Sequence, residues 1–246
     1  SLHDALPIYE SALYAKEHAL RGSHFPTYDL PFNLVLGIWG IPLYLYQNYT
    51  GGEDITYSFI KMLYGKSILL AALIITVVLV YKICRTLKLS KNESLWGSYL
   101  YFTSAIVTCS VAIVGQSDVI GMIFILSAFM AFLKHEDKKF FILFIIAMPF
   151  KMYAMFLLLP LMLLREKRIH MIIMKISAVF GFTLLCNLSL INNTEALSVK
   201  TWFNIGMLNT LLSNNLPLIN SKVSVFVILF GFVCLYCYFN SSDDID

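Results

Sequence analysis

The sequence predicts an all-α polytopic membrane protein, and three observations carry this prediction. Of the 246 residues, 59% are hydrophobic and only 13% are charged, whereas soluble domains carry about 25% charged residues. The apolar residues form runs of the length needed to cross about 30 Å of hydrocarbon. The basic residues gather in short stretches between these runs. The net charge is only +3, so we expect no nucleic-acid partner.

Residues 1–8, SLHDALPI, are interpreted as a translated sequencing adapter rather than native sequence. Their back-translation, TCC-CTA-CAC-GAC-GCT-CTT-CCG-ATC, matches the end of a common short-read adapter, and one leftover T fits the first base of the Tyr9 codon. We therefore exclude these residues from the fold prediction. Under this interpretation the chain is a fragment whose native N-terminus lies upstream. A genuine N-terminus that matches by chance is the alternative.

Four apolar runs are long enough to span a membrane. They cover residues 67–83, 95–114, 171–190 and 222–239. The run at residues 119–133 is shorter but uncharged, and we expect it to span together with its polar flanks. Two further runs are ambiguous. Residues 31–47 are interrupted by Gly37, Gly40 and Pro42, and residues 140–164 carry Lys151 at their centre.

The basic residues predict the topology, because cytoplasmic loops collect Lys and Arg. Three short loops hold ten of the 18 basic residues. They are Lys82, Arg85, Lys88 and Lys91; Lys134, Lys138 and Lys139; and Arg165, Lys167 and Arg168. With all three loops inside, residues 140–164 start and end inside. We therefore predict a re-entrant helical hairpin there, with Pro149, Phe150 and Lys151 at its tip.

The same rule divides the chain into regions. Residues 9–66 form a first outer loop with an amphipathic helix and, at residues 31–47, a segment in the outer interface, where Trp39 and its neighbouring tyrosines are favoured. Residues 67–239 form the transmembrane helical bundle. Residues 240–246 are a polar tail, which we interpret as a loop cut short by the end of the fragment.

Ionisable groups within or beside a membrane are costly and point to function. Gly115, Gln116, Ser117 and Asp118 form a polar turn between two apolar runs. Gln116 and Asp118 offer a donor and an acceptor to a sugar or phosphate. Asp118 as a helix N-cap is the structural alternative. Lys151 at the hairpin tip would attract a lipid phosphate as a point charge, or else extend to the interface.

The outer loop holds two further carboxylates. Asp29 lies where the chain turns toward the membrane, and Glu10 lies in the first turn of the expected amphipathic helix. Each has a structural alternative, since Asp is common in turns and Glu is favoured at a helix N-terminus.

We predict no metal site. Five cysteines lie in or beside apolar runs, and Cys234 and Cys237 form a CxxC inside a predicted membrane helix. There the pair is expected to pack as small apolar residues.

In this order the motifs resemble the GT-C membrane glycosyltransferases, particularly bacterial relatives of the GPI-anchor mannosyltransferases and polyprenyl-phosphate-dependent enzymes. The resemblance covers residues 9 to about 168. Its parts are Tyr9, Ala15, Gly22 and residues 28–31 (Tyr-Asp-x-Pro); the LGIWGIPLYL stretch; Lys66 opening the next helix; the Gly-Gln-x-Asp turn at residues 115–118; and FK-x-Y-A-x(4)-LP at residues 150–160.

The resemblance implies transfer of a hexose or mannose-like sugar from a polyprenyl-phosphate donor to a cell-envelope glycan or other acceptor. In that family an Asp in the first outer loop is the catalytic base, and it usually lies just before the Tyr matched by Tyr9. Asp4 stands there, but as an adapter-encoded residue it does not receive the role, so the fragment is expected to lack this Asp and to be inactive alone. Asp29 and Glu10 remain as catalytic candidates. The substrate-binding candidates are Tyr28, Gln116, Asp118, Lys151 and Tyr153.

Two other functions fit the same composition. A transporter or flippase of lipid-linked saccharides would also place polar groups at mid-depth, although the internal repeat that favours one is not seen. A non-catalytic membrane scaffold would need no outer-loop carboxylate. We expect no cofactor beyond the lipid-linked sugar, which is a substrate. The expected location is the bacterial plasma membrane, with the active site facing outward.

Overall fold

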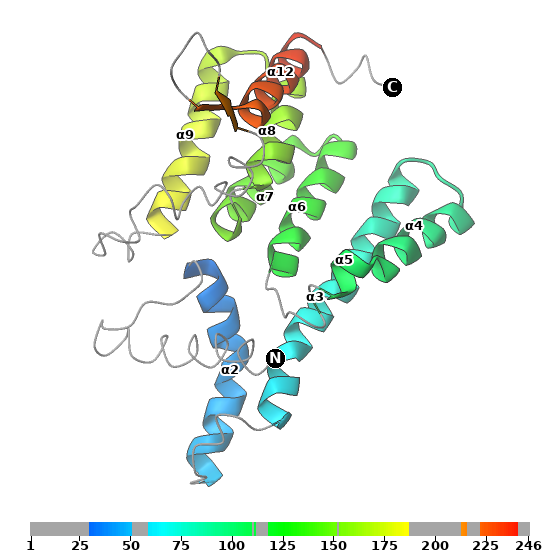
Figure 1. The fold of residues 1–246 in the computed structure, drawn as a ribbon, viewed down its shortest axis with the longest axis vertical. Helices are drawn as coiled ribbons and strands as arrows, with labels where there is room; N and C mark the ends of the chain where they lie inside the picture. Colours follow the sequence, from blue (N-terminus) through cyan, green and yellow to red (C-terminus); the bar gives the residue numbers. More distant parts are fainter. Residues whose placement is uncertain are drawn as a thin grey trace. The chain divides into compact units, whose positions relative to one another are not determined.

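The computed structural model describes residues 30–50, 59–109, 111, 118–151, 153–186, 213–215 and 222–240. The chain divides into two compact units, residues 1–151 and residues 152–246, and each is described by itself. The described residues are helical apart from one pair of short strands in the second unit (Figure 1). The prediction of a helical protein is confirmed for this part of the chain.

The described part of the first unit is a set of helices packed side by side. Helix α3 packs against α4 and α6, and α6 packs against α7. The helices are α2 (Leu30–Thr50), α3 (Phe59–Thr86), α4 (Lys91–Thr103), α5 (Ala105–Thr108), α6 (Asp118–Leu133) and α7 (Asp137–Phe150).

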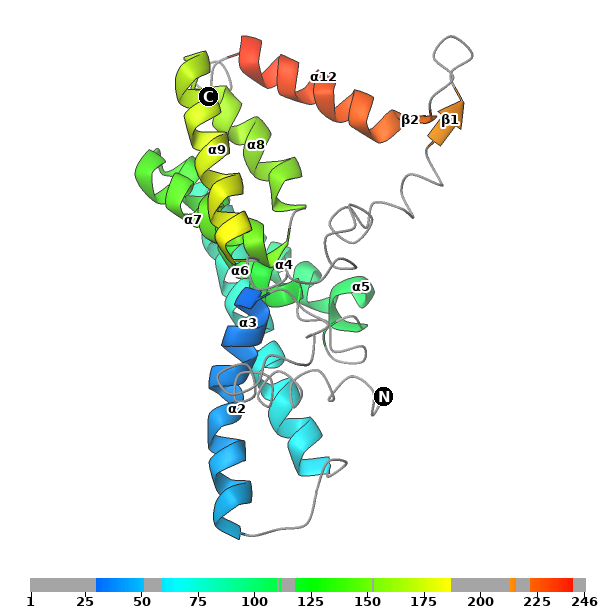
Figure 2. The same ribbon diagram turned by 90° about the vertical axis from the view of Figure 1, so that its left-hand side faces the viewer.

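The described part of the second unit holds α8 (Ala154–Arg165), α9 (Ile169–Cys186) and α12 (Val225–Phe239). The strands β1 (Ser213–Asn215) and β2 (Lys222–Ser224) pair antiparallel, with Asn214 opposite Val223. Figure 2 shows the strands at the N-terminal end of α12, and α12 approaching α8 toward its C-terminal end. The apolar run predicted to start at residue 222 therefore begins with a strand, because the polar Lys222 and Ser224 pair with β1 before the helix starts.

Within the described residues, two helices are long and apolar enough to cross a membrane. They are Leu63–Thr86, which contains the predicted run at residues 67–83, and Ile169–Cys186. Only 33% and 11% of their most apolar windows are buried inside the chain. The core helix of a soluble protein would be mostly buried, so this exposure supports membrane association.

The described part of the apolar run at residues 95–114 is not one continuous helix. That the run spans a membrane stays a prediction. Helix α4 ends at Thr103, and Ser104 adopts a non-helical backbone with φ −56° and ψ 120°. The hydroxyl groups of Thr103 and Thr108 donate to the backbone carbonyls of Tyr99 and Phe102. Hydroxyl groups of this kind compete with backbone N–H groups for carbonyl oxygens and so weaken a helix.

The expected interruptions in residues 31–47 are also absent, since α2 is continuous with Pro42 inside it. The turn just before Pro42 is fastened to α3. The Trp39 ring stacks on Tyr64 with centroids 5.6 Å apart. The Tyr64 hydroxyl donates to the Trp39 carbonyl at 2.7 Å, and the indole N–H of Trp39 donates to the Tyr64 carbonyl at 3.3 Å. These contacts offset the hydrogen bond that a proline removes from a helix. The interfacial location of α2 stays a prediction.

Residues 140–164 form two helices rather than one. The hairpin prediction requires such a break, although insertion into a membrane stays a prediction. The residues divide between α7 and α8, and the chain leaves the helical conformation at Lys151, with φ −155° and ψ 120°. Helices of 14 and 12 residues extend only about 21 and 18 Å at 1.5 Å per residue. Each is shorter than the hydrocarbon core of a bilayer.

Candidate functional site

The first unit joins two of the predicted site residues directly. The Nζ atom of Lys151 lies 2.7 Å from Oδ1 of Asp118. Both side chains are partly open to solvent, with 30% of Lys151 and 38% of Asp118 exposed. An ion pair that a ligand can reach thus connects the first residue of α6 to the end of α7, where the tip of the hairpin was predicted.

The α6–α7 hairpin explains why these two residues meet. The chain leaves α6 through a tight turn in which His135 has φ 58°. The N–H of Glu136 donates to the Ala131 carbonyl and that of His135 to the Phe132 carbonyl, which is the Schellman pattern of a helix C-terminus. Helices of 16 and 14 residues that run back along each other bring the start of α6 beside the end of α7.

Close packing beneath the pair fixes the stem of the lysine. A Cβ atom added to Gly121 would lie 3.4 Å from Cβ of Phe150 and 3.6 Å from Cγ of Lys151. One turn further along α6, the Phe124 ring stacks on Phe150 with centroids 4.9 Å apart. A glycine at this position lets the end of α7 approach α6, and the aromatic pair holds it there.

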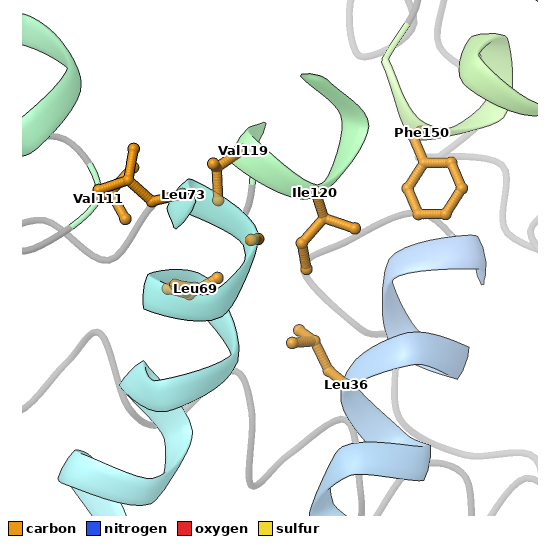
Figure 3. Close-up of a cluster of buried hydrophobic side chains, with 8 residues drawn as sticks. Leu36, Leu69, Leu73, Val111, Val119, Ile120 and Phe150 are labelled. Atoms are coloured by element: carbon orange, nitrogen blue, oxygen red, sulfur yellow. The ribbon is translucent and has the colours of Figure 1, made fainter. Parts of the chain in front are cut away.

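A hydrophobic core supports the same end of the hairpin. Its buried members come from four helices and from Val111, and Figure 3 shows them converging below the start of α6. From the helices they are Leu36 of α2; Leu69, Ala72 and Leu73 of α3; Val119 and Ile120 of α6; and Phe150 of α7. Because Val119 and Phe150 adjoin Asp118 and Lys151 in sequence, core packing sets the positions of both charged residues.

The N-terminus of α6 stabilises the negative charge of Asp118, and the C-terminus of α7 stabilises the positive charge of Lys151. Asp118 lies in the first turn of α6 and Lys151 is the C-cap residue of α7. A helix N-terminus carries partial positive charge and a C-terminus partial negative charge. Asp118 is the first residue inside α6 rather than its N-cap, which differs from the structural alternative. Its role in ligand binding stays a prediction.

Of the remaining predicted site residues, the structure describes only Tyr153. Glu10, Tyr28, Asp29 and Gln116 lie outside the described residues. Tyr153 belongs to the second unit, where it is the N-cap residue of α8 and is 38% exposed.

Neither the CxxC pair nor any other group in the described part of the chain offers a metal site. There, no cluster of three or more His, Cys, Asp or Glu residues is placed to hold an ion. Cys237 is buried and Cys234 is half-buried on α12, both as free thiols.

Sequence reasoning missed a polar cluster in the second unit. Nζ of Lys167 lies 2.8 Å from each of the carbonyl oxygens of Leu163, Cys237 and Tyr238 and also contacts that of Asn240, so its three N–H groups are shared among four acceptors. The Tyr238 hydroxyl donates back to the Lys167 carbonyl at 3.1 Å. A cation here satisfies carbonyls that the end of α12 leaves without intrahelical partners. The end of α12 thus lies beside the α8–α9 junction.

The neighbouring carboxylate forms a second part of this cluster. Glu166 is only 9% exposed. It accepts from Nζ of Lys175 at 2.9 Å and from Nε of Arg168 at 3.1 Å. The hydrogen bond from Lys175, helped by Arg168 and opposed by burial, lowers the pKa of Glu166 from 4.5 to about 2. The sequence shows a basic loop here, but no local signal predicts these partners.

The comparisons with known proteins assign no family to this arrangement. No protein-family model matches the chain, and neither a curated protein nor a solved structure matches it.

Proposed function

We propose that the protein is a membrane glycosyltransferase of the GT-C type, which transfers a hexose or mannose-like sugar from a polyprenyl-phosphate donor to a cell-envelope acceptor. The observation that carries the proposal is the 2.7 Å contact between Lys151 and Asp118. These residues come from the two motifs that resemble the family most closely within the described chain. Their contact supports a shared polar site made by the Gly-Gln-x-Asp turn and the Phe-Lys end of α7.

Lys151 is the proposed ligand of the donor phosphate. An ammonium group binds phosphate as a point charge, and this one is fixed at its stem but 30% exposed at its side chain. In an inverting transfer, a carboxylate base takes the proton of the acceptor hydroxyl, the hydroxyl oxygen attacks the anomeric carbon, and polyprenyl phosphate leaves. A cation beside the leaving phosphate stabilises the charge that develops there.

The proposed location is the bacterial plasma membrane, with the site facing outward. The helices Leu63–Thr86 and Ile169–Cys186 support the membrane part of this proposal. The basic loops support the orientation, because the positive-inside rule places Lys134, Lys138 and Lys139 in the cytoplasm. Asp118 and Lys151 lie at the opposite end of the α6–α7 hairpin from this loop.

Binding and transfer test the proposal separately. The chain is reconstituted in neutral phosphatidylcholine nanodiscs and titrated with a short polyprenyl-phosphate hexose. We expect saturable binding that Lys151→Met weakens at least tenfold, and equal binding by both chains would contradict the proposed role of Lys151. Transfer to an envelope acceptor is measured separately, with a polyprenyl-phosphate hexose in membranes that contain the protein. Failure to transfer any polyprenyl-linked sugar would favour a transporter or scaffold.

A further inference from the structure

The carboxylate of Asp118 occupies one of the three N–H directions through which Lys151 could bind a phosphate. An oxygen of Asp118 lies 2.7 Å from Nζ of Lys151, which is the distance of a charge-assisted hydrogen bond between an ammonium and an anionic oxygen. A phosphate oxygen that used the same N–H direction would occupy the same space. Asp118 therefore resembles, in chemistry and position, one oxygen of the ligand assigned to this lysine.

The ion pair between Asp118 and Lys151 is weak enough for a ligand to break. Ion pairs with solvent-exposed partners contribute little to stability, and both side chains here are about one-third exposed. The lysine stem, in contrast, packs against Gly121 and the adjoining Phe150 lies in the core. Only the polar end of each side chain is free to change its partner, while the backbone that carries it stays fixed.

We propose that Asp118 is an internal counter-ion, which pairs with Lys151 until a phosphate group displaces it. The ligand class is a phosphate monoester or diester, either the head of a polyprenyl lipid or a free phosphate. This inference rests on the proposed function for the role of Lys151, and adds that Asp118 opposes phosphate binding instead of assisting it. A carboxylate near an anionic ligand repels it, so its removal strengthens binding although it removes a polar residue from the site.

A titration of the full chain in neutral nanodiscs tests this inference. The probes are farnesyl phosphate and inorganic phosphate, and the readout is the dissociation constant from calorimetry. We expect Asp118→Asn to bind farnesyl phosphate about fivefold more tightly than the wild type, which is the size expected for release from a partly exposed ion pair. Asp118→Ser also lacks the carboxylate and is expected to show the same increase, so it decides the question if the Asn variant does not fold.

A double-mutant cycle separates competition from a general effect of charge. In the background of Lys151→Met, removal of the Asp118 carboxylate should change affinity less than twofold. The matched control is the pair Lys139–Glu136, at 3.0 Å on the same hairpin. Glu136→Gln makes the same change in net charge and should leave affinity within twofold of the wild type.

The other outcomes test the counter-ion role of Asp118, the role of Lys151 and the source of the phosphate separately. Unchanged or weaker binding by both Asp118 variants, with binding still lost in Lys151→Met, would overturn the counter-ion role and leave the proposed function standing. Unchanged binding by Lys151→Met would overturn both. Tightening for both probes, with inorganic phosphate bound at least as tightly as farnesyl phosphate, would support displacement of Asp118 by free phosphate and would contradict the lipid donor.

Discussion

Lys167 and Tyr238 bond to each other in both directions. The Lys167 ammonium donates to the Tyr238 carbonyl at 2.8 Å, and the Tyr238 hydroxyl donates to the Lys167 carbonyl at 3.1 Å. The same ammonium lies 5.8 Å from the centre of the Tyr238 ring. Two residues 71 positions apart thus attach the end of α12 to the α8–α9 junction.

Removal of the Lys167 charge should loosen α12. Lys167→Met keeps most of the apolar stem and removes the donor for the carbonyls at the end of α12. We expect the free energy of unfolding to fall by about 2 kcal/mol, because hydrogen bonds to a charged group are among the stronger ones and a cation also favours a helix C-terminus. Reversible unfolding in detergent, followed by circular dichroism, measures the change. Lys138→Met, at an exposed position, should stay within about 0.5 kcal/mol of the wild type. Equal losses in the two variants would contradict the attachment.

Glu166 should make stability depend on pH in acid. Its pKa is lowered from 4.5 to about 2 in the folded chain, so its contribution is complete above pH 4.5 and disappears as the pH falls toward 2. The contribution is on the order of 2 to 3 kcal/mol. Glu166→Gln should therefore be less stable than the wild type at pH 6, and the difference should close by pH 2. Thermal unfolding at a series of pH values measures it.

Glu136→Gln is the control that measures how much acid changes stability independently of Glu166. Glu136→Gln alters an exposed pair, in which 42% of the Glu136 side chain is accessible, and should shift stability by less than about 0.5 kcal/mol at either pH. A gap between wild type and Glu166→Gln that stays constant from pH 6 to pH 2 would show that the carboxylate does not titrate as inferred.

Gly121 should tolerate a methyl group but no larger side chain. The added Cβ of alanine would lie 3.4 Å from Phe150 Cβ, an ordinary contact, and alanine favours a helix by about 1 kcal/mol over glycine. We expect Gly121→Ala to keep or slightly raise stability. Gly121→Leu should lower stability by about 1–3 kcal/mol through overpacking and weaken phosphate binding by displacing Lys151. Gly181→Leu is the control, because a Cβ there meets nothing within 4 Å. Equal stability of the two leucine variants would argue against the close approach.

Glycine should stabilise the protein at two positions, Lys88 and His135, in the turns that follow α3 and α6. Lys88 and His135 have φ values of 64° and 58°, in a left-handed region that costs a side-chain-bearing residue about 1–2 kcal/mol. Lys88→Gly and His135→Gly should each raise the free energy of unfolding by about 1 kcal/mol, measured by unfolding in detergent. Lys138→Gly, inside the first turn of α7, should lower it by a similar amount. Destabilisation by all three would contradict the turn geometry.

Residue patterns predicted several local features well. The long apolar run around residues 67–83 falls inside α3, and the run at residues 119–133 coincides with α6. The break at Lys151 was expected because the basic loops on both sides face the same way. Patterns failed at Ser104, which ends a helix inside an apolar run, and at Pro42, which does not end one. Hydropathy does not report these breaks, because it does not register the side-chain hydrogen bonds to backbone carbonyls around Ser104 or the contacts that hold α2 against α3 beside Pro42.

Residue patterns alone predict helices, which the described part of the chain forms, and they mark Asp118 and Lys151 as polar residues beside apolar runs. Hydropathy and charge are local properties, so they can be read along the chain. That Asp118 and Lys151 form a pair, and that Lys167 binds the end of α12, follows only from the tertiary structure. Such contacts depend on helix length, on the turns that reverse the chain, and on the close approach of α7 at Gly121. A lysine ammonium binds the oxygen atoms that packing places within about 3 Å of it. No local sequence pattern specifies which oxygen atoms these are.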